Sequence, residues 1–242
     1  MIEIIAHRGF SAIAPENTLA AFDLAIKYGA NSIEFDVQLS AEGVPVIFHD
    51  TTLDRITRTS GKVRDKTLEE LNSLDAGAWF DRRFSGEKIP TLKSALTILK
   101  NVEKFLYFDV KPDCEWSSSE VKNFVNTLLV EGVNNKSVIT SFNAQFLEQV
   151  REVSQDLLIG RIVANESDYK AQLAKALAAE DRLISSQYRV LLDHPSLVEN
   201  SRNRGVDVVA WTVDSREDVV KLVDIGVMRI VTNSLIGNEI KL

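Results

Sequence analysis

Short apolar strand patterns alternate with helix patterns along most of this chain, and this alternation constrains the fold more than any other feature. Eight runs rich in β-branched and apolar residues, bounded by polar or glycine-containing turns, recur within the 242 residues. The predicted strands are 3–6, 33–37, 105–110, 137–140, 157–162, 183–186, 206–211 and 228–232. The predicted helices are 18–28, 92–100, 118–131, 144–153, 167–178, 195–204 and 215–224. Because parallel strands covered on both faces are almost continuously apolar, the alternation predicts an α/β fold, a (β/α)8 TIM barrel.

The segment from about residue 51 to residue 90 interrupts this rhythm. It contains turns rich in threonine, arginine and glycine, one predicted short helix at 68–74, and the aromatic residues Trp79, Phe80 and Phe84. It follows the second strand, where barrel enzymes tolerate long loops. We therefore expect residues 1–242 to form a single barrel domain with an insertion at about 51–90. The insertion is too small for a robust core of its own, and we expect it to pack as a lid over the barrel mouth.

Charge and hydropathy exclude several classes of partner. The chain has 28 basic and 35 acidic residues, a net charge of −7, which argues against nucleic acid or an anionic membrane as the main partner. No apolar run reaches the roughly 18 residues of a membrane span, and the first residues carry no basic leader. We expect a cytoplasmic protein with a small-molecule substrate and no stable membrane insertion. Nothing in the pattern indicates an oligomeric state.

The stretch Ser32–Asp50 concentrates candidate functional residues. In an extended segment side chains alternate between faces, so Glu34 and Asp36 share one face of the second strand. Residues 40–43 are typical of a turn, and so short a connection can only make an antiparallel hairpin. Counting back from the turn places Asp36 opposite Ile47 and Glu34 opposite His49. The hairpin is therefore expected to return His49 to the level of the two carboxylates.

Other polar residues occur where further strands end. His7 and Arg8 follow the first strand, Asp109 and Lys111 share one face at the end of the third, and Trp211 ends the seventh. Barrel enzymes carry their active sites at the C-terminal ends of the strands. These residues are therefore predicted to meet at the barrel mouth.

The residue types indicate chemistry at a phosphate group. Glu34, Asp36 and Asp109 supply oxygen ligands, which suit a hard divalent cation, Mg²⁺ or Ca²⁺. Arg8 offers a planar donor fork and Lys111 a point charge, and both suit a phosphate. Two histidines can take a proton from the attacking hydroxyl and give one to the leaving oxygen. The predicted reaction is cleavage of a phosphodiester.

These residues also belong to a set of motifs that resembles one known family over nearly the whole chain. The motifs are His7-Arg8-Gly9, Pro15-Glu16-Asn17-Thr18, Glu34-x-Asp36, His49-Asp50, Leu53-Asp54-Arg55, Leu74-Asp75-Ala76-Gly77, Ile89-Pro90-Thr91-Leu92, Asp109-Val110-Lys111, Ser141-Phe142 and Trp211-Thr212-Val213. In order and spacing they resemble glycerophosphodiester phosphodiesterases.

The resemblance implies a metal-dependent hydrolase that cuts deacylated phospholipid headgroups, which are glycerophosphodiesters, to sn-glycerol 3-phosphate and an alcohol. It implies that His7 and His49 are the acid/base pair and that the three carboxylates are metal ligands. It also implies that Arg8 and Lys111 contact the phosphate and that Trp211 packs against the glycerol or headgroup. Attack by water and attack by the glycerol 2-hydroxyl through a cyclic phosphate both fit the pattern.

Two positions depart from the family pattern. Asp109 stands where the family usually has glutamate, so its carboxylate reaches about 1.5 Å less far and the cation is expected to shift or gain a bridging water. Near the C-terminus Asn233 follows Thr232 where the family tends to have aspartate. The second change is expected to alter the hydrogen bonds at the end of the last strand.

Three other functions use some of the same residues. A barrel that binds a phosphorylated metabolite without turnover would need Arg8 and Lys111 but not two histidines. A phospholipase-D-like enzyme acting on intact lipid would need an apolar or basic docking surface. A metal-dependent aldolase-type barrel would use paired acids and a cation, but it would not explain His49 on the hairpin.

Overall fold

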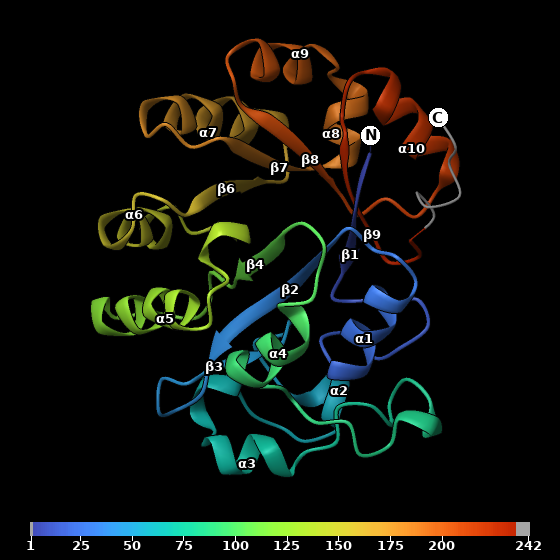
Figure 1. Cartoon of the computed structure of the whole chain (residues 1–242), viewed down its shortest axis with the longest axis vertical. Helices are drawn as coiled ribbons and strands as arrows, with labels where there is room; N and C mark the ends of the chain where they lie inside the picture. The colour runs from blue at the N-terminus through green and yellow to red at the C-terminus, as the bar shows by residue number, and fades with distance from the viewer. Residues whose placement is uncertain (1, 236–242) are drawn as a thin grey trace.

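Eight parallel strands close into a barrel, as the sequence predicts. The computed structural model describes residues 2–235. The barrel strands are β1 (Glu3–His7), β2 (Ser32–Leu39), β4 (Leu106–Val110), β5 (Ser137–Ser141), β6 (Leu158–Val163), β7 (Leu183–Gln187), β8 (Asp207–Trp211) and β9 (Arg229–Thr232). Each pairs in parallel with its neighbours, and the pairing of β1 with both β2 and β9 closes the ring. The chain is therefore a TIM barrel (Figure 1).

Helices surround the barrel and lie close to the predicted positions. They are α1 (Leu19–Lys27), α4 (Leu92–Leu99), α5 (Ser118–Val130), α6 (Ala144–Val153), α7 (Glu166–Ala178), α8 (Tyr188–Asp193), α9 (Ser196–Asn203) and α10 (Arg216–Asp224). Seven begin after a side chain that caps a free backbone N–H group. These caps are Thr18, Thr91, Ser117, Asn143, Asn165, Gln187 and Ser215. The short helix α8 was not predicted, because it follows β7 directly and leaves no turn signal between them.

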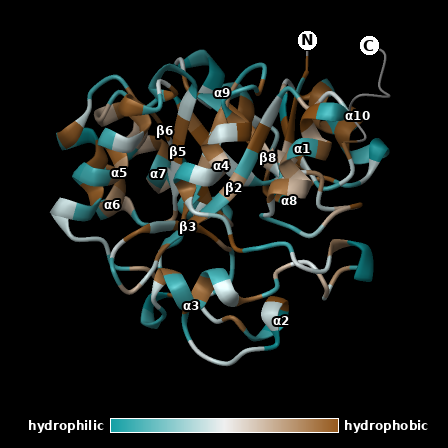
Figure 2. Ribbon diagram, turned by 60° about the horizontal axis from the view of Figure 1, so that its bottom comes forward, coloured by the Kyte–Doolittle hydropathy of each residue, from teal (hydrophilic) through white to brown (hydrophobic). Residues whose placement is uncertain are grey.

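The two faces of each barrel strand have different surroundings. On β2, Ile33, Phe35 and Val37 point outward and are fully buried against the helices. Phe35 packs edge-on against Phe22 of α1 and Phe108 of β4, with ring centroids 5.7 and 4.7 Å apart. The inward faces of the strands carry a second, smaller apolar cluster together with the polar residues of the mouth. The buried members of this inner cluster are Ile5, Tyr107, Val138, Leu183, Val209 and Val231. Figure 2 shows the brown apolar interior and the teal outer surfaces of the helices.

The hairpin exists, but its register is one residue away from the prediction. Strand β3 (Pro45–Ile47) pairs antiparallel with β2, and Val37 lies opposite Ile47 where Asp36 was expected. The reason is the turn: the Ser40 N–H donates to the Val44 carbonyl at 2.9 Å, so the loop has three residues. It closes at Gly43, whose φ of 75° suits glycine.

The segment 51–90 holds short elements and a small apolar cluster. Its elements are α2 (Asp54–Thr57), η1 (Val63–Asp65), α3 (Leu68–Ser73) and η2 (Arg82–Phe84), and α2 and α3 lie beyond one end of the barrel (Figures 1 and 2). The buried members of the cluster are Leu53, Ile56, Val63, Leu71, Ala76 and Ile89, together with Val46 and Phe48 of the hairpin. The insertion therefore shares its core with the hairpin that carries His49. No helix within residues 2–235 is both long and apolar enough to cross a membrane.

Candidate active site

Strand register assembles the polar residues at the mouth of the barrel. In the parallel pairing of β1 with β2, His7 lies beside Glu34. In the pairing of β2 with β4, Asp36 lies beside Asp109. Because neighbouring strands are about 4.8 Å apart, in-register side chains on the inner face come into contact distance. Four predicted site residues are therefore neighbours as a consequence of the sheet itself.

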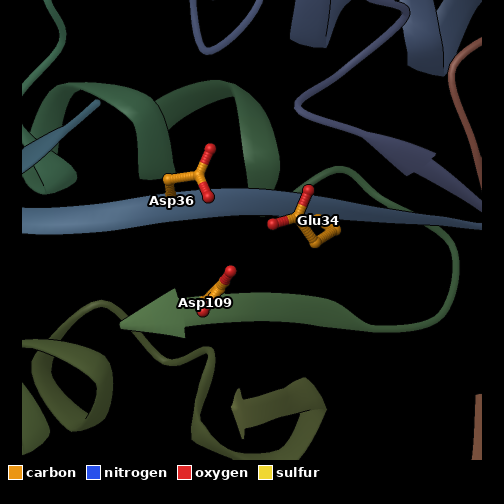
Figure 3. Close-up of side chains that lie close together, drawn as sticks. All are labelled: Glu34, Asp36 and Asp109. Atoms are coloured by element: carbon orange, nitrogen blue, oxygen red, sulfur yellow. The ribbon is translucent and has the colours of Figure 1, made fainter. Parts of the chain in front are cut away.

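Three carboxylates form a compact cluster that could hold a metal ion. Glu34 and Asp36 project from β2 and Asp109 from β4 (Figure 3), and one oxygen from each lies within 4.8 Å of the others. Burial, with the charges of Asp36 and Asp109, raises the pKa of Glu34 well above its usual value. Among residues 2–235 the buried Oδ1 of Asp109 has no hydrogen-bond partner. A hard cation would satisfy that oxygen and offset the repulsion, so the donor set fits one.

Asp36 is the most strongly held of the three. Lys111 Nζ lies 2.6 Å from its Oδ1 and the Asn17 side-chain amide donates to its Oδ2 at 2.6 Å. Burial alone would raise the pKa of Asp36, but Lys111 and Arg8 outweigh it and lower the pKa below the usual range. Lys111 Nζ also lies 2.7 Å from Asp109 Oδ2, so it bridges the two acids.

Arg8 enters the site from a tightly turned loop after β1. Its φ of 57° is left-handed, and its backbone N–H donates to Glu34 Oε2 at 2.9 Å. Its guanidinium lies 2.7 Å from Glu16 and 3.3 Å from Asp36. The next residue, Gly9, has a φ of 80°, and a Cβ there would come within 2.7 Å of Ala21. A larger residue at position 9 would displace the loop that aims Arg8.

His7 is held through Nδ1 by a neutral side chain. Its Nδ1 lies 2.7 Å from Asn233 Oδ1, and its Nε2 lies 3.9 Å from Glu34 and 3.3 Å from Arg8 Nε, which donates to it. An amide oxygen only accepts, so Nδ1 carries the proton and Nε2 the lone pair. Burial, followed by the charge of Arg8, lowers the pKa of His7 to about 4. Near neutral pH the ring is therefore uncharged.

His49 is held through the same ring atom by a charged side chain. Its Nδ1 lies 2.6 Å from Asp50 Oδ1, and Asp50 accepts two hydrogen bonds from Arg55 of the insertion, at 2.6 and 2.9 Å. Arg55 also makes two hydrogen bonds to Glu16. The Gln38 amide donates to the Phe48 and Asp50 carbonyls, which flank His49. These bonds place His49 at the mouth despite the shifted register.

One cavity is lined by seven of the eight predicted site residues, and the eighth, Asp36, is buried and does not line it. The polar wall of the cavity contains both histidines, Arg8 and Lys111, and its other wall is largely apolar. The lining residues are His7, Arg8, Glu34, His49, Tyr107, Asp109, Lys111, Thr140, Phe142, Ile162, Ser185, Val209, Trp211, Thr212 and Val231. Trp211 meets Phe142 edge-on, with ring centroids 6.2 Å apart. Within residues 2–235 no lining residue comes from 51–90, so the insertion flanks the mouth and does not cover it as a lid.

Several residues that hold the site were not assigned a role from the sequence. The sequence motifs include Asn17, Asp50 and Arg55 without indicating a role for them, and no motif includes Asp214. Asn17 contacts Asp36 and Asp50 contacts His49 directly, whereas Arg55 acts through Asp50 and Asp214 through Asn233. All four lie outside the barrel strands, in segments whose path the strand pattern does not determine. The adjacency of Asp50 to His49 was a usable signal, because a carboxylate next to a histidine often orients the ring.

Comparisons with known proteins agree with this geometry. The model of the glycerophosphoryl diester phosphodiesterase family matches residues 7–236. A glycerophosphodiester phosphodiesterase of Caldanaerobacter subterraneus subsp. tengcongensis is 35% identical over 234 residues, 95% of this chain and 93% of that protein. A phosphodiesterase of Oleispira antarctica, solved in complex with the product sn-glycerol-3-phosphate, superposes with a TM-score of 0.89 at 29% identity, covering 98% of this chain and 95% of that one. A glycerophosphodiester phosphodiesterase of Agrobacterium tumefaciens gives 0.84 at 28% identity, covering 98% and 100%.

Proposed function

Because this chain belongs to the glycerophosphoryl diester phosphodiesterase family, we propose that its barrel mouth hydrolyses glycerophosphodiesters with one divalent cation and two histidines. The chain is a phosphoric diester hydrolase, and its products are sn-glycerol 3-phosphate and an alcohol. The observation that carries the assignment of the site is the meeting of three carboxylates and two histidines around one cavity. A barrel that only binds a phosphorylated metabolite would have no use for either histidine.

Glu34, Asp36 and Asp109 would hold the cation, and all-oxygen ligands favour Mg²⁺ or Ca²⁺. Bound there, the cation would stabilise negative charge on the phosphoryl oxygens. The side chain of Asp109 is shorter than that of a glutamate, but its Oδ1 has no hydrogen-bond partner within residues 2–235. The Asp109 carboxylate therefore remains able to bind the ion directly or through a water.

Arg8 and Lys111 would bind the phosphate. Both line the cavity, and both are already fixed by carboxylates, Arg8 by Glu16 and Lys111 by Asp36 and Asp109. Pre-oriented cations do not need to reorganise when charge develops on the phosphoryl group. Trp211, on the largely apolar wall, would pack against the carbon atoms of the glycerol or headgroup.

The hydrogen bonds of the histidines suggest different roles for them. His7 is neutral and presents a lone pair at Nε2, so it would take the proton from the attacking hydroxyl, either water or the glycerol 2-hydroxyl. His49 faces the Asp50 carboxylate, which stabilises a positive charge on the ring. His49 would therefore give a proton to the leaving alcohol oxygen. The predicted cytoplasmic location and the absence of a nucleic-acid partner rest on the sequence alone.

The test is release of sn-glycerol 3-phosphate from glycerophosphocholine and glycerophosphoethanolamine by the purified protein. EDTA, Mg²⁺ and Ca²⁺ are compared side by side, and Glu34→Gln is titrated with the preferred ion. We expect release that EDTA abolishes, and a higher ion concentration for half-maximal activity in the variant. Release unaffected by EDTA, or an unchanged titration in the variant, would contradict the metal site.

A further inference from the structure

A single aspartate outside the catalytic cavity contacts Asn233, the partner of His7. Asp214 lies in the loop that follows β8, three residues after Trp211. Its Oδ1 accepts from the Asn233 backbone N–H at 2.8 Å and from the Thr232 hydroxyl at 3.0 Å. Its Oδ2 accepts from the Asn233 side-chain amide nitrogen at 2.5 Å. Asp214 therefore contacts both the backbone and the side chain of Asn233.

The chemistry of these groups allows only one arrangement of protons. A carboxylate only accepts hydrogen bonds, so the NH₂ group of Asn233 must face Asp214 and its oxygen must face His7. That oxygen can only accept, so the proton of His7 must sit on Nδ1. The Ser11 hydroxyl, 2.8 Å from the same oxygen, is compatible with this orientation. Nε2 is left with its lone pair in the cavity, where Arg8 Nε approaches to 3.3 Å.

We propose that Asp214 is a positioning residue that acts through Asn233 to keep His7 in the tautomer protonated at Nδ1. This inference rests on the proposed role of His7 as the group that accepts a proton at Nε2. Without the Asp214 carboxylate the amide of Asn233 is free to turn around and present its NH₂ group to Nδ1. The ring would then be protonated at Nε2 and could not accept a proton there.

The experiment compares three variants with the wild type. Asp214→Ala removes the group that orients the amide. Thr232→Val is the matched control, because it removes one hydrogen bond to Asp214 but leaves the bond between Asp214 and the amide nitrogen. The double variant Asp214→Asn with Asn233→Asp exchanges amide and carboxylate, so position 233 again only accepts from Nδ1 while position 214 donates. The ¹⁵N shifts of the His7 ring, with Mg²⁺ present, report the tautomer.

In Asp214→Ala we expect a His7 population protonated at Nε2, a fall in kcat of about 10- to 100-fold, and an almost unchanged KM. Thr232→Val should keep the wild-type tautomer and lose at most about twofold in kcat, because the hydrogen bond that it removes holds the loop and not the amide of Asn233. The exchanged pair should restore the wild-type tautomer and part of the lost kcat, because the carboxylate then facing Nδ1 fixes the proton there but also favours the positive form of the ring. A role limited to holding the loop together would move none of the ring shifts.

Two results would overturn the inference. One is a His7 ring that stays protonated at Nδ1 in Asp214→Ala, and the other is an equal loss of kcat in Thr232→Val. A changed tautomer with unchanged kcat would contradict a different statement, the proposed role of His7 in the reaction. The two failures are therefore distinguishable.

Discussion

The two histidines of the site are held through the same ring atom by partners of different charge. His7 ends β1, and its Nδ1 lies 2.7 Å from the neutral amide of Asn233. His49 follows β3, and its Nδ1 lies 2.6 Å from the Asp50 carboxylate. The side chain of His7 is 19% exposed and that of His49 is 34% exposed. The more accessible ring is therefore the one with the charged partner.

In the proposed mechanism this difference separates the roles of the two histidines. A neutral partner fixes the tautomer of His7 without favouring its positive form, which suits a group that begins the reaction as a base. A carboxylate fixes His49 and also stabilises its positive form, which suits a group that begins as an acid. Environment can assign opposite roles to chemically identical side chains in one site.

The supports of the two rings come from different parts of the chain. His7 depends on the loops after β8 and β9, through Asp214 and Asn233. His49 depends on the hairpin and on Arg55 of the insertion. The insertion thus supports the site through the contact of Arg55 with the Asp50 carboxylate, although no residue of 51–90 lines the cavity.

Removing either ring should have the largest effect. His7→Ala and His49→Ala are each expected to lower kcat by about 10²- to 10⁴-fold, because acid/base groups contribute that much. Thermal unfolding followed by circular dichroism is the control, and both variants should unfold cooperatively as the wild type does. More than about one hundredth of wild-type activity in either variant would remove that histidine from the acid/base pair.

Asp50→Asn should make the support of His49 resemble that of His7. An amide can still accept from Nδ1 but carries no charge, so we expect kcat to fall by about 10- to 100-fold. Steady-state kinetics with glycerophosphoethanolamine measures the change, and KM should remain close to that of the wild type. Unchanged kcat would show that the charge of the partner does not distinguish the two histidines.

Arg55→Met should have a smaller effect, because Arg55 is partly exposed and acts through Asp50. A partly exposed ion pair contributes up to about 1 kcal/mol, so kcat should fall by up to about fivefold. Combined with Asp214→Ala, the losses in ln kcat should add, since the two residues support different histidines. A marked departure from additivity would mean that the two supports are coupled, with Glu16, which contacts both Arg8 and Arg55, as the first residue to examine.

Asp75→Ala should have the smallest effect on activity, because Asp75 serves the insertion alone. It accepts from the backbone N–H groups of Gly77, Ala78 and Gly86, and these bonds lower its pKa from 3.8 to about 2. A depressed pKa means that its stabilisation is complete above pH about 4 and is lost as the pH falls toward 2. At neutral pH the three amide hydrogens should exchange with solvent faster in the variant than in the wild type. The kcat of the variant should be nearly unchanged. Equal exchange rates would contradict the role of Asp75.

The sequence predicted the barrel and the positions of the site residues because both depend on strand periodicity. Glu34 and Asp36 were predicted to share one face of the second strand, and Asp109 and Lys111 one face of the third. Parallel pairing of the two strands places the three acids together. The geometry of the loops could be predicted less well from the sequence. A turn one residue shorter than expected shifted the hairpin register, and the contacts of Asp214 depend on two loops that are distant in sequence.

The division of labour between the histidines is tested most directly by changing the leaving group. Wild type, His7→Ala and His49→Ala are compared on an alkyl ester and on the 4-nitrophenyl ester of glycerol 3-phosphate. Because 4-nitrophenolate needs no protonation to leave, His49→Ala should regain most of its activity on that ester while His7→Ala should not. Recovery of His7→Ala instead, or an equal deficit of both variants on both esters, would contradict the assignment of base and acid.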